Sequence, residues 1–110
     1  MPITRRQFEL GILPETEWWM EELYDFFLEH EDQAFSIGDL RESFRLGRHV
    51  APAKASALKE RRHVDAALET LFKVGAIHGG YVKNKGEVYY LFKQPVEKGT
   101  WKIKESSKSA

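Results

Sequence analysis

The side chains best suited to bind a ligand are basic, and they gather in the second half of the 110-residue chain. Lys and Arg side chains on one surface hold phosphate oxygens through their charge, so this grouping points to a nucleic-acid backbone. The candidates for such contacts are Arg48, Lys54, Ser56, Lys59, Arg62, His63, Lys83, Asn84 and Lys85. Lys59, Arg62 and His63 are expected on the polar face of one helix, and residues 83–85 at the tip of a hairpin.

Other residue patterns that could do chemistry are weak. The chain has no cysteine and four histidines, His30, His49, His63 and His78. These histidines lack the ligand spacing of a zinc site. The carboxylates of Glu21, Glu22 and residues 29–32 are typical of the solvated face of an amphipathic helix. Gly79-Gly80 has no lysine at phosphate-loop spacing, and no serine lies in a nucleophile-elbow pattern. We therefore expect no enzyme activity, no metal and no cofactor.

The charge is divided unevenly along the chain. There are 17 basic and 17 acidic residues, and the net charge is zero, which alone would disfavour a nucleic-acid partner. Residues 1–44, however, hold eleven acids and three bases, a balance of −8, so residues 45–110 carry +8. Such asymmetry indicates a polar partner on one side. The alternative is that an acidic helix and a basic helix face each other within one domain.

Length and composition limit the class of protein. A chain of 110 residues with 42% hydrophobic residues is expected to form one globular domain. No apolar run approaches the roughly 18 residues that span a bilayer. The N-terminal residues include no apolar stretch of signal-peptide type. We therefore expect a soluble cytoplasmic protein.

Capping residues and apolar spacing predict the first two helices. Thr4 followed by Gln7 has the form of a capping box, so a short helix is expected from about residue 5 to residue 10, ending at Gly11. Pro14 suits the first position of a second helix, which should end near residue 30. Its apolar face repeats at helical spacing through Trp19, Leu23, Phe26 and Phe27.

The rest of the chain predicts two more helices and a hairpin. A minimal strand over 34–36 leads, through a second capping box at Ser36 and Asp39, into a helix that stops at Gly47. Residues 47–55 are either a loop or the start of the next helix, which runs over 53–74. Strands over 81–82 and 87–92 should flank a turn at 83–86. One more short strand is expected over 100–104, with Trp101 and Ile103 on one side, followed by a disordered end.

This order resembles that of a winged helix-turn-helix domain. The resemblance rests on Phe35-Ser36-Ile37-Gly38-Asp39-Leu40 at the start of the family's second helix and on Glu87-Val88-Tyr89-Tyr90-Leu91 as the returning wing strand. Between them, residues 64–77 (VDAALETLFKVGAI) resemble the third helix and its exit into the wing. Many winged-helix families share the Ala-Leu-x-x-Leu-x-x-x-Gly-x-Ile pattern, MarR-like and PadR-like repressors among them, and no single family is identified.

The resemblance implies an α+β, mainly helical fold: a winged helix-turn-helix over 14–94 with a two- or three-stranded wing sheet. Residues 1–13 would be an N-terminal arm or short helix, and 95–110 a basic C-terminal tail. It also implies that the protein binds double-stranded DNA as a small transcriptional regulator. The third helix would lie in the major groove and the wing tip on the backbone.

Three further expectations concern partners. The connection over 47–56 is longer than the three- or four-residue turn of a compact helix-turn-helix. The alternative function is therefore a winged-helix protein-interaction module without DNA binding; a weaker option is RNA stacking on Tyr81, Tyr89 or Tyr90. Aromatic and aliphatic residues off the main stripe predict a homodimer built on the N-terminal helices. These residues are Phe8, Trp18 and Leu28.

Overall fold

A capping box begins the first N-terminal helix, and a proline begins the second. The computed structural model describes residues 2–44 and 54–104. Helix α1 covers Arg5–Leu10; the Gln7 N–H donates to the Thr4 hydroxyl at 3.0 Å, and the Thr4 N–H donates to the Gln7 side chain at 2.9 Å. Gly11 ends α1 in the left-handed region at φ 73. Helix α2 spans Pro14–Glu29 and begins on its proline. Both predicted helices are confirmed.

Local sequence also predicts the next strand, the start of the helix after it and the C-terminal end of the helix that follows. Strand β1 is Phe35–Ser36, helix α3 is Ile37–Phe44 and helix α4 is Lys54–Val74. The Asp39 N–H donates to the Ser36 hydroxyl at 3.1 Å, and the Ser36 N–H donates to the Asp39 carboxylate at 3.2 Å, so the second capping box forms. Gly75, at φ 88, ends α4. Residues 45–53, which include the predicted end of the second-last helix at Gly47, lie outside the described residues.

A three-stranded antiparallel sheet follows in the order β1-β3-β2. Strand β2 is Ile77–Val82 and β3 is Glu87–Phe92. The turn between them has the predicted form: the Lys85 and Gly86 N–H groups donate to the Val82 carbonyl at 3.0 and 2.9 Å, with Gly86 at φ 68. The prediction is wrong at the start of β2. The strand begins at Ile77, so the glycine pair lies inside it, paired with Tyr90 and Tyr89.

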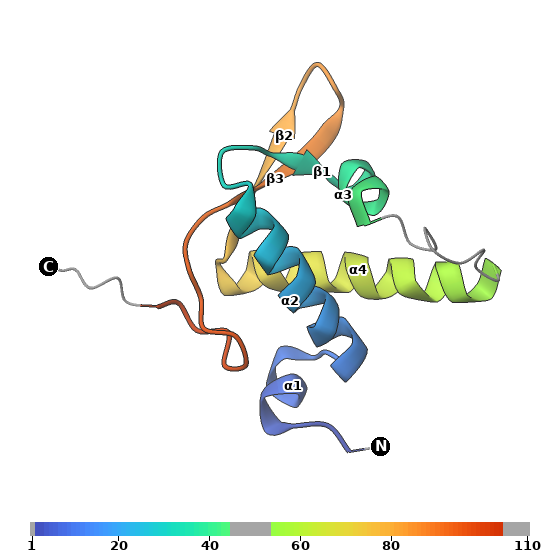
Figure 1. Cartoon of the computed structure of the whole chain (residues 1–110), viewed down its shortest axis with the longest axis vertical. Coiled ribbons are helices and arrows are strands. Elements are labelled where there is room, and N and C mark those ends of the chain that lie inside the picture. The colour runs from blue at the N-terminus through green and yellow to red at the C-terminus, as the bar shows by residue number, and fades with distance from the viewer. Residues whose placement is uncertain (1, 45–53, 105–110) are drawn as a thin grey trace, which may run out of the picture.

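The core lies where α2 crosses α4 beside the sheet (Figure 1). Met20, Leu23 and Phe27 of α2 and Leu71 of α4 are fully buried. Their burial explains why these residue types recur at helical spacing on the two facing helices. Within the described part of the chain the protein is a small α+β fold with four helices and one three-stranded antiparallel sheet. None of these helices is long and apolar enough to cross a membrane.

The segment over 95–104 is part of the core, which corrects two predictions. Val96 and Trp101 are each only 1% exposed, so this segment is not a tail. It contains no strand over 100–104, since a single bridge pairs Val96 with Ile103. Trp101 and Ile103 do not share a side, because Ile103 is 48% exposed. Trp101 has a positive φ of 57, which breaks the alternation of an extended strand. Residues 105–110, predicted as disordered, lie outside the described residues.

Glu17 joins three segments around this tryptophan. Its carboxylate accepts a hydrogen bond from the Gln7 side chain at 2.7 Å and another from the Trp101 indole at 2.8 Å. The Trp101 ring stands edge-on to Tyr24, whose hydroxyl accepts the Val96 N–H at 3.1 Å. Hydrogen bonds to a charged acceptor are stronger than neutral ones. The C-terminal segment is therefore held against α1 and α2 by both packing and polar contacts.

Candidate nucleic-acid interface

The clearest basic feature among the described residues is the hairpin tip. Lys83, Asn84 and Lys85 are all exposed and occupy the turn between β2 and β3. The hairpin extends beyond the helices, and its tip lies well apart from the C-terminal segment (Figure 1). The turn hydrogen bonds to Val82 fix the backbone that carries these side chains. Two ammonium groups and one amide are thus presented together to solvent, as phosphate contacts require.

Helix α4 supplies fewer described basic side chains than the sequence predicts. Arg62 is exposed, as expected, and Lys73 is exposed near the C-terminal end of the helix. The side chains of three other candidates, Lys54, Ser56 and Lys59, lie outside the described part of the chain, and so does the whole of Arg48.

His63 corrects the predicted polar face of α4. Its Nδ1 lies 3.0 Å from the Thr16 hydroxyl of α2, and its Nε2 is buried without a hydrogen-bond partner. His63 precedes the fully buried Ala67 by four residues, and residues four apart share one face of a helix. The ring therefore faces α2 rather than the surface that carries Arg62, and it cannot contact a nucleic acid there.

The pair formed by Thr16 and His63 gives a stability prediction. Thr16→Val should lower the free energy of unfolding by about 1–3 kcal/mol, because it leaves the second ring nitrogen of a half-buried histidine without a partner. The double variant Thr16→Val/His63→Leu should recover part of this loss, since no unpaired polar group then remains. Urea denaturation of both variants measures the free energy of unfolding. A double variant no more stable than Thr16→Val would contradict the expectation.

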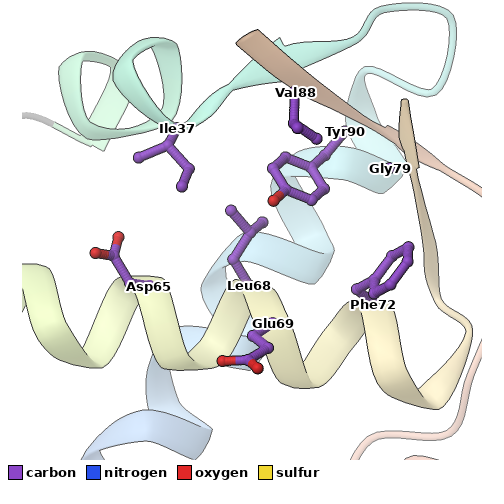
Figure 2. Close-up of a pocket in the computed structure, with 8 residues that line it drawn as sticks. All are labelled: Ile37, Asp65, Leu68, Glu69, Phe72, Gly79, Val88 and Tyr90. Atoms are coloured by element: carbon purple, nitrogen blue, oxygen red, sulfur yellow. The ribbon is translucent and has the colours of Figure 1, made fainter. Parts of the chain in front are cut away.

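A groove runs along α4 next to the face that packs on α2 (Figure 2). Its volume is about 440 Å³, and it opens between α4, the start of α3 and the hairpin. The apolar side chains that line it are Ile37, Leu68, Phe72, Val88 and Tyr90. Two carboxylates on the α4 side, Asp65 and Glu69, complete it. Sequence reasoning missed this groove, although the spacing of residues 65, 68, 69 and 72 puts all four on one face of a helix.

The groove divides the surface that α4 offers to a partner. Asp65 and Glu69 make the middle of the helix negative, which repels phosphate. Phosphate contacts would therefore be unfavourable in the middle of α4, whereas Arg62 and the hairpin tip are exposed and basic. Among the described residues, no group of three or more His, Asp or Glu side chains is placed to hold a metal ion.

The predicted dimer residues are exposed, as a contact surface requires. Phe8 is 75%, Trp18 53% and Leu28 42% exposed. Trp18 leans edge-on against Trp19, with 4.9 Å between ring centroids, so it is held on the surface in a fixed orientation. Ordered aromatic side chains of this kind are common anchors of protein interfaces.

The homodimer through Phe8, Trp18 and Leu28 stays a prediction. Light scattering at tens of micromolar should give twice the 12.8 kDa mass of the chain. Trp18→Glu should shift this to one chain mass, because it places a charge in an apolar contact. Ile103→Glu, which adds the same charge at an equally exposed site, should leave the mass unchanged. A single chain mass for the wild type would contradict the dimer.

Comparison of the chain with protein-family models, with curated proteins and with solved structures gives no match in any of the three.

Proposed function

We propose that the protein is a winged-helix regulator that binds double-stranded DNA. The succession α2, β1, α3, α4, β2 and β3, with sheet order β1-β3-β2, corresponds to the elements of a winged helix. In this arrangement α4 is the recognition helix and the β2–β3 hairpin is the wing. The observation that carries the proposal is the exposed basic tip of that wing, Lys83–Lys85.

The proposed mode of binding follows from the distribution of charge along α4. The first half of the helix carries Lys54, Lys59 and Arg62 and would enter the major groove, while the wing tip would lie on the backbone. Glu69, two turns after Arg62 on the same face, would stay outside the contact. The acidic side chains of α2 support this orientation, because the exposed Asp25 and Glu29 lie on neither α4 nor the wing hairpin. Attraction to DNA is then modest and directional despite the net charge of zero.

A duplex-binding screen at two salt concentrations tests the proposal. The full chain should retard random-sequence duplex DNA at about 50 mM salt, where non-specific binding is strongest. Raising the salt to about 200 mM should weaken binding about 100-fold if four phosphates are contacted. An absence of retardation at the lower salt concentration would overturn the proposal.

A protein-interaction module is the second candidate function. The observation that favours it is the acidic and apolar surface in the middle of α4, where Glu69 and Phe72 are both exposed. A recognition helix buried deeply in DNA would bring these side chains toward phosphates. The same duplex screen discriminates the two candidates, since an interaction module predicts no salt-dependent retardation.

A further inference from the structure

The groove between α4 and the hairpin has the walls of a small-molecule site. Its volume of about 440 Å³ falls within the range of about 300–1,000 Å³ that is typical of ligand pockets. Leu68, Phe72 and Val88 give it apolar walls, and Phe72 and Val88 are 50% and 41% exposed. A ligand placed here would cover apolar surface that the protein alone leaves in water. The groove thus offers a favourable place for an aromatic or aliphatic group.

Two aromatic rings close over Gly79 on the hairpin side of the groove. A Cβ atom added at this position would lie 3.3 Å from Cε1 of Phe72 and 3.3 Å from Cε1 of Tyr90, which is closer than an ordinary contact between carbon atoms. The φ of Gly79 is not positive, so the backbone does not require glycine here. A glycine inside a strand costs stability, and close approach of another group is a common reason for it. The groups that approach here are the two rings, which form the hairpin wall of the groove.

The polar groups of the groove favour a cation. Glu69 is exposed on its α4 side, and among the described residues it has no hydrogen-bond or ion-pair partner. Asp65, one turn earlier, adds a second carboxylate to the same side. Figure 2 shows the Tyr90 ring and its hydroxyl pointing into the groove toward Leu68, with Asp65 on the far side and Glu69 along the lower edge of α4. Aromatic faces attract cations, so the rings and the carboxylates select the same charge.

We propose that this groove binds a small organic cation that carries an aromatic or aliphatic group. The apolar group lies against the exposed faces of Phe72 and Val88, and the ammonium lies toward Glu69. The site does not rest on DNA binding, because its residues are distinct from the wing tip and it is tested without DNA. Negatively charged compounds of the same shape are excluded by the two carboxylates.

A pair of probes of opposite charge tests the selectivity. The full chain, labelled with nitrogen-15, is titrated with 4-phenylbutylammonium and, separately, with 4-phenylbutyrate. The ammonium should shift the amide signals of Gly79 and Glu69 saturably, and the carboxylate should not. Equal saturable shifts with both probes would overturn the selection for a cation. An ammonium that gives no saturable shift up to about 10 mM, which corresponds to about −2.7 kcal/mol, would overturn the site itself.

Two matched pairs of variants locate the ligand. Gly79→Ala forces the Phe72 or Tyr90 ring to shift in the wall of the groove and should weaken binding of the ammonium about tenfold. Gly80→Ala makes the same change at the next residue, where no atom lies within 4 Å, and should leave binding unchanged. Glu69→Gln should weaken binding about two- to fivefold, as expected for one exposed charge pair, whereas Glu29→Gln on α2 should have no effect. Equal effects within either pair would contradict the placement.

Discussion

Replacing Lys83 and Lys85 by alanine is expected to weaken duplex DNA binding about 60-fold at about 0.1 M salt. Each lysine is exposed at the wing tip, where it would neutralise one phosphate and release its counterion. Loss of two such contacts should also lower the slope of log affinity against log salt by about 1.8. Retardation of duplex DNA across a series of salt concentrations measures both quantities. The fold should be unaffected, because both side chains project into solvent from a turn held by backbone hydrogen bonds.

A matched double variant separates a local contact from a general loss of charge. Lys102→Ala/Lys104→Ala removes the same two charges from exposed positions on the C-terminal segment. That segment lies well apart from the wing tip (Figure 1). Loss of these two lysine charges should change the affinity for DNA by less than about threefold, since charges beyond a Debye length of roughly 10 Å act only weakly. If both double variants weakened binding equally, the wing would have no special role.

Replacing Trp101 by alanine is expected to lower the free energy of unfolding by about 3–5 kcal/mol. The ring is 1% exposed, packs edge-on to Tyr24 and donates its indole N–H to Glu17. Its removal leaves a cavity and deprives Glu17 of one of its two hydrogen-bond donors. For a domain of ordinary stability, about 5–15 kcal/mol, this is a large fraction of the total. Urea denaturation followed by circular dichroism measures the loss.

Two controls make the tryptophan result specific. Ile103→Ala, two residues away and 48% exposed, should change stability by less than about 0.5 kcal/mol. Trp101→Phe keeps an aromatic ring but not the N–H, so its loss should lie between those of the alanine variant and the wild type. A Trp101→Ala variant as stable as Ile103→Ala would show that residues 95–104 do not contribute to the core.

Elements that are determined by neighbouring residues could be predicted from the sequence. Thr4 with Gln7, Ser36 with Asp39, and the glycine of the turn at residue 86 act within four residues, so their geometry depends little on the rest of the chain. The same holds for Gly75, which ends α4 at positive φ. Local chemistry therefore predicts both ends of α1 and of α2, the start of α3 and the end of α4 within a residue or two.

Features that depend on distant contacts could not be predicted. Trp101 is buried against α2, more than 70 residues earlier, with a positive φ that its residue type does not favour. His63 lies at the boundary between the apolar and polar faces of α4, and the packing of α2 decides that its ring turns toward Thr16. The groove needs α3, α4 and the hairpin together, so no single periodicity reveals it. The wing tip is the part of the candidate interface that local sequence does reveal.

The charge division along the chain is resolved in part by the packing of the helices. Helices α2 and α4 meet through apolar residues such as Leu23 and Leu71, so the acidic side chains of α2 are not matched to a basic face of α4 there. Among the described residues, Lys98 of the second half lies 2.7 Å from Asp25 of the first half. The hydrogen bond from Lys98 to Asp25 raises the pKa of the lysine above its ordinary value of 10.5. The exposed basic wing tip is not neutralised by that pair.

The proposed interface is tested most directly by mapping DNA onto the labelled full chain. Backbone amide signals are followed by nuclear magnetic resonance while a random-sequence duplex is added at about 50 mM salt, where backbone contacts are strongest. We expect the largest shifts at Lys83–Gly86 and in the first half of α4, with little change along the acidic side of α2 at Asp25 and Glu29. Saturable shifts confined to α2 or to the groove around Glu69, or no shift at the wing tip, would contradict the account.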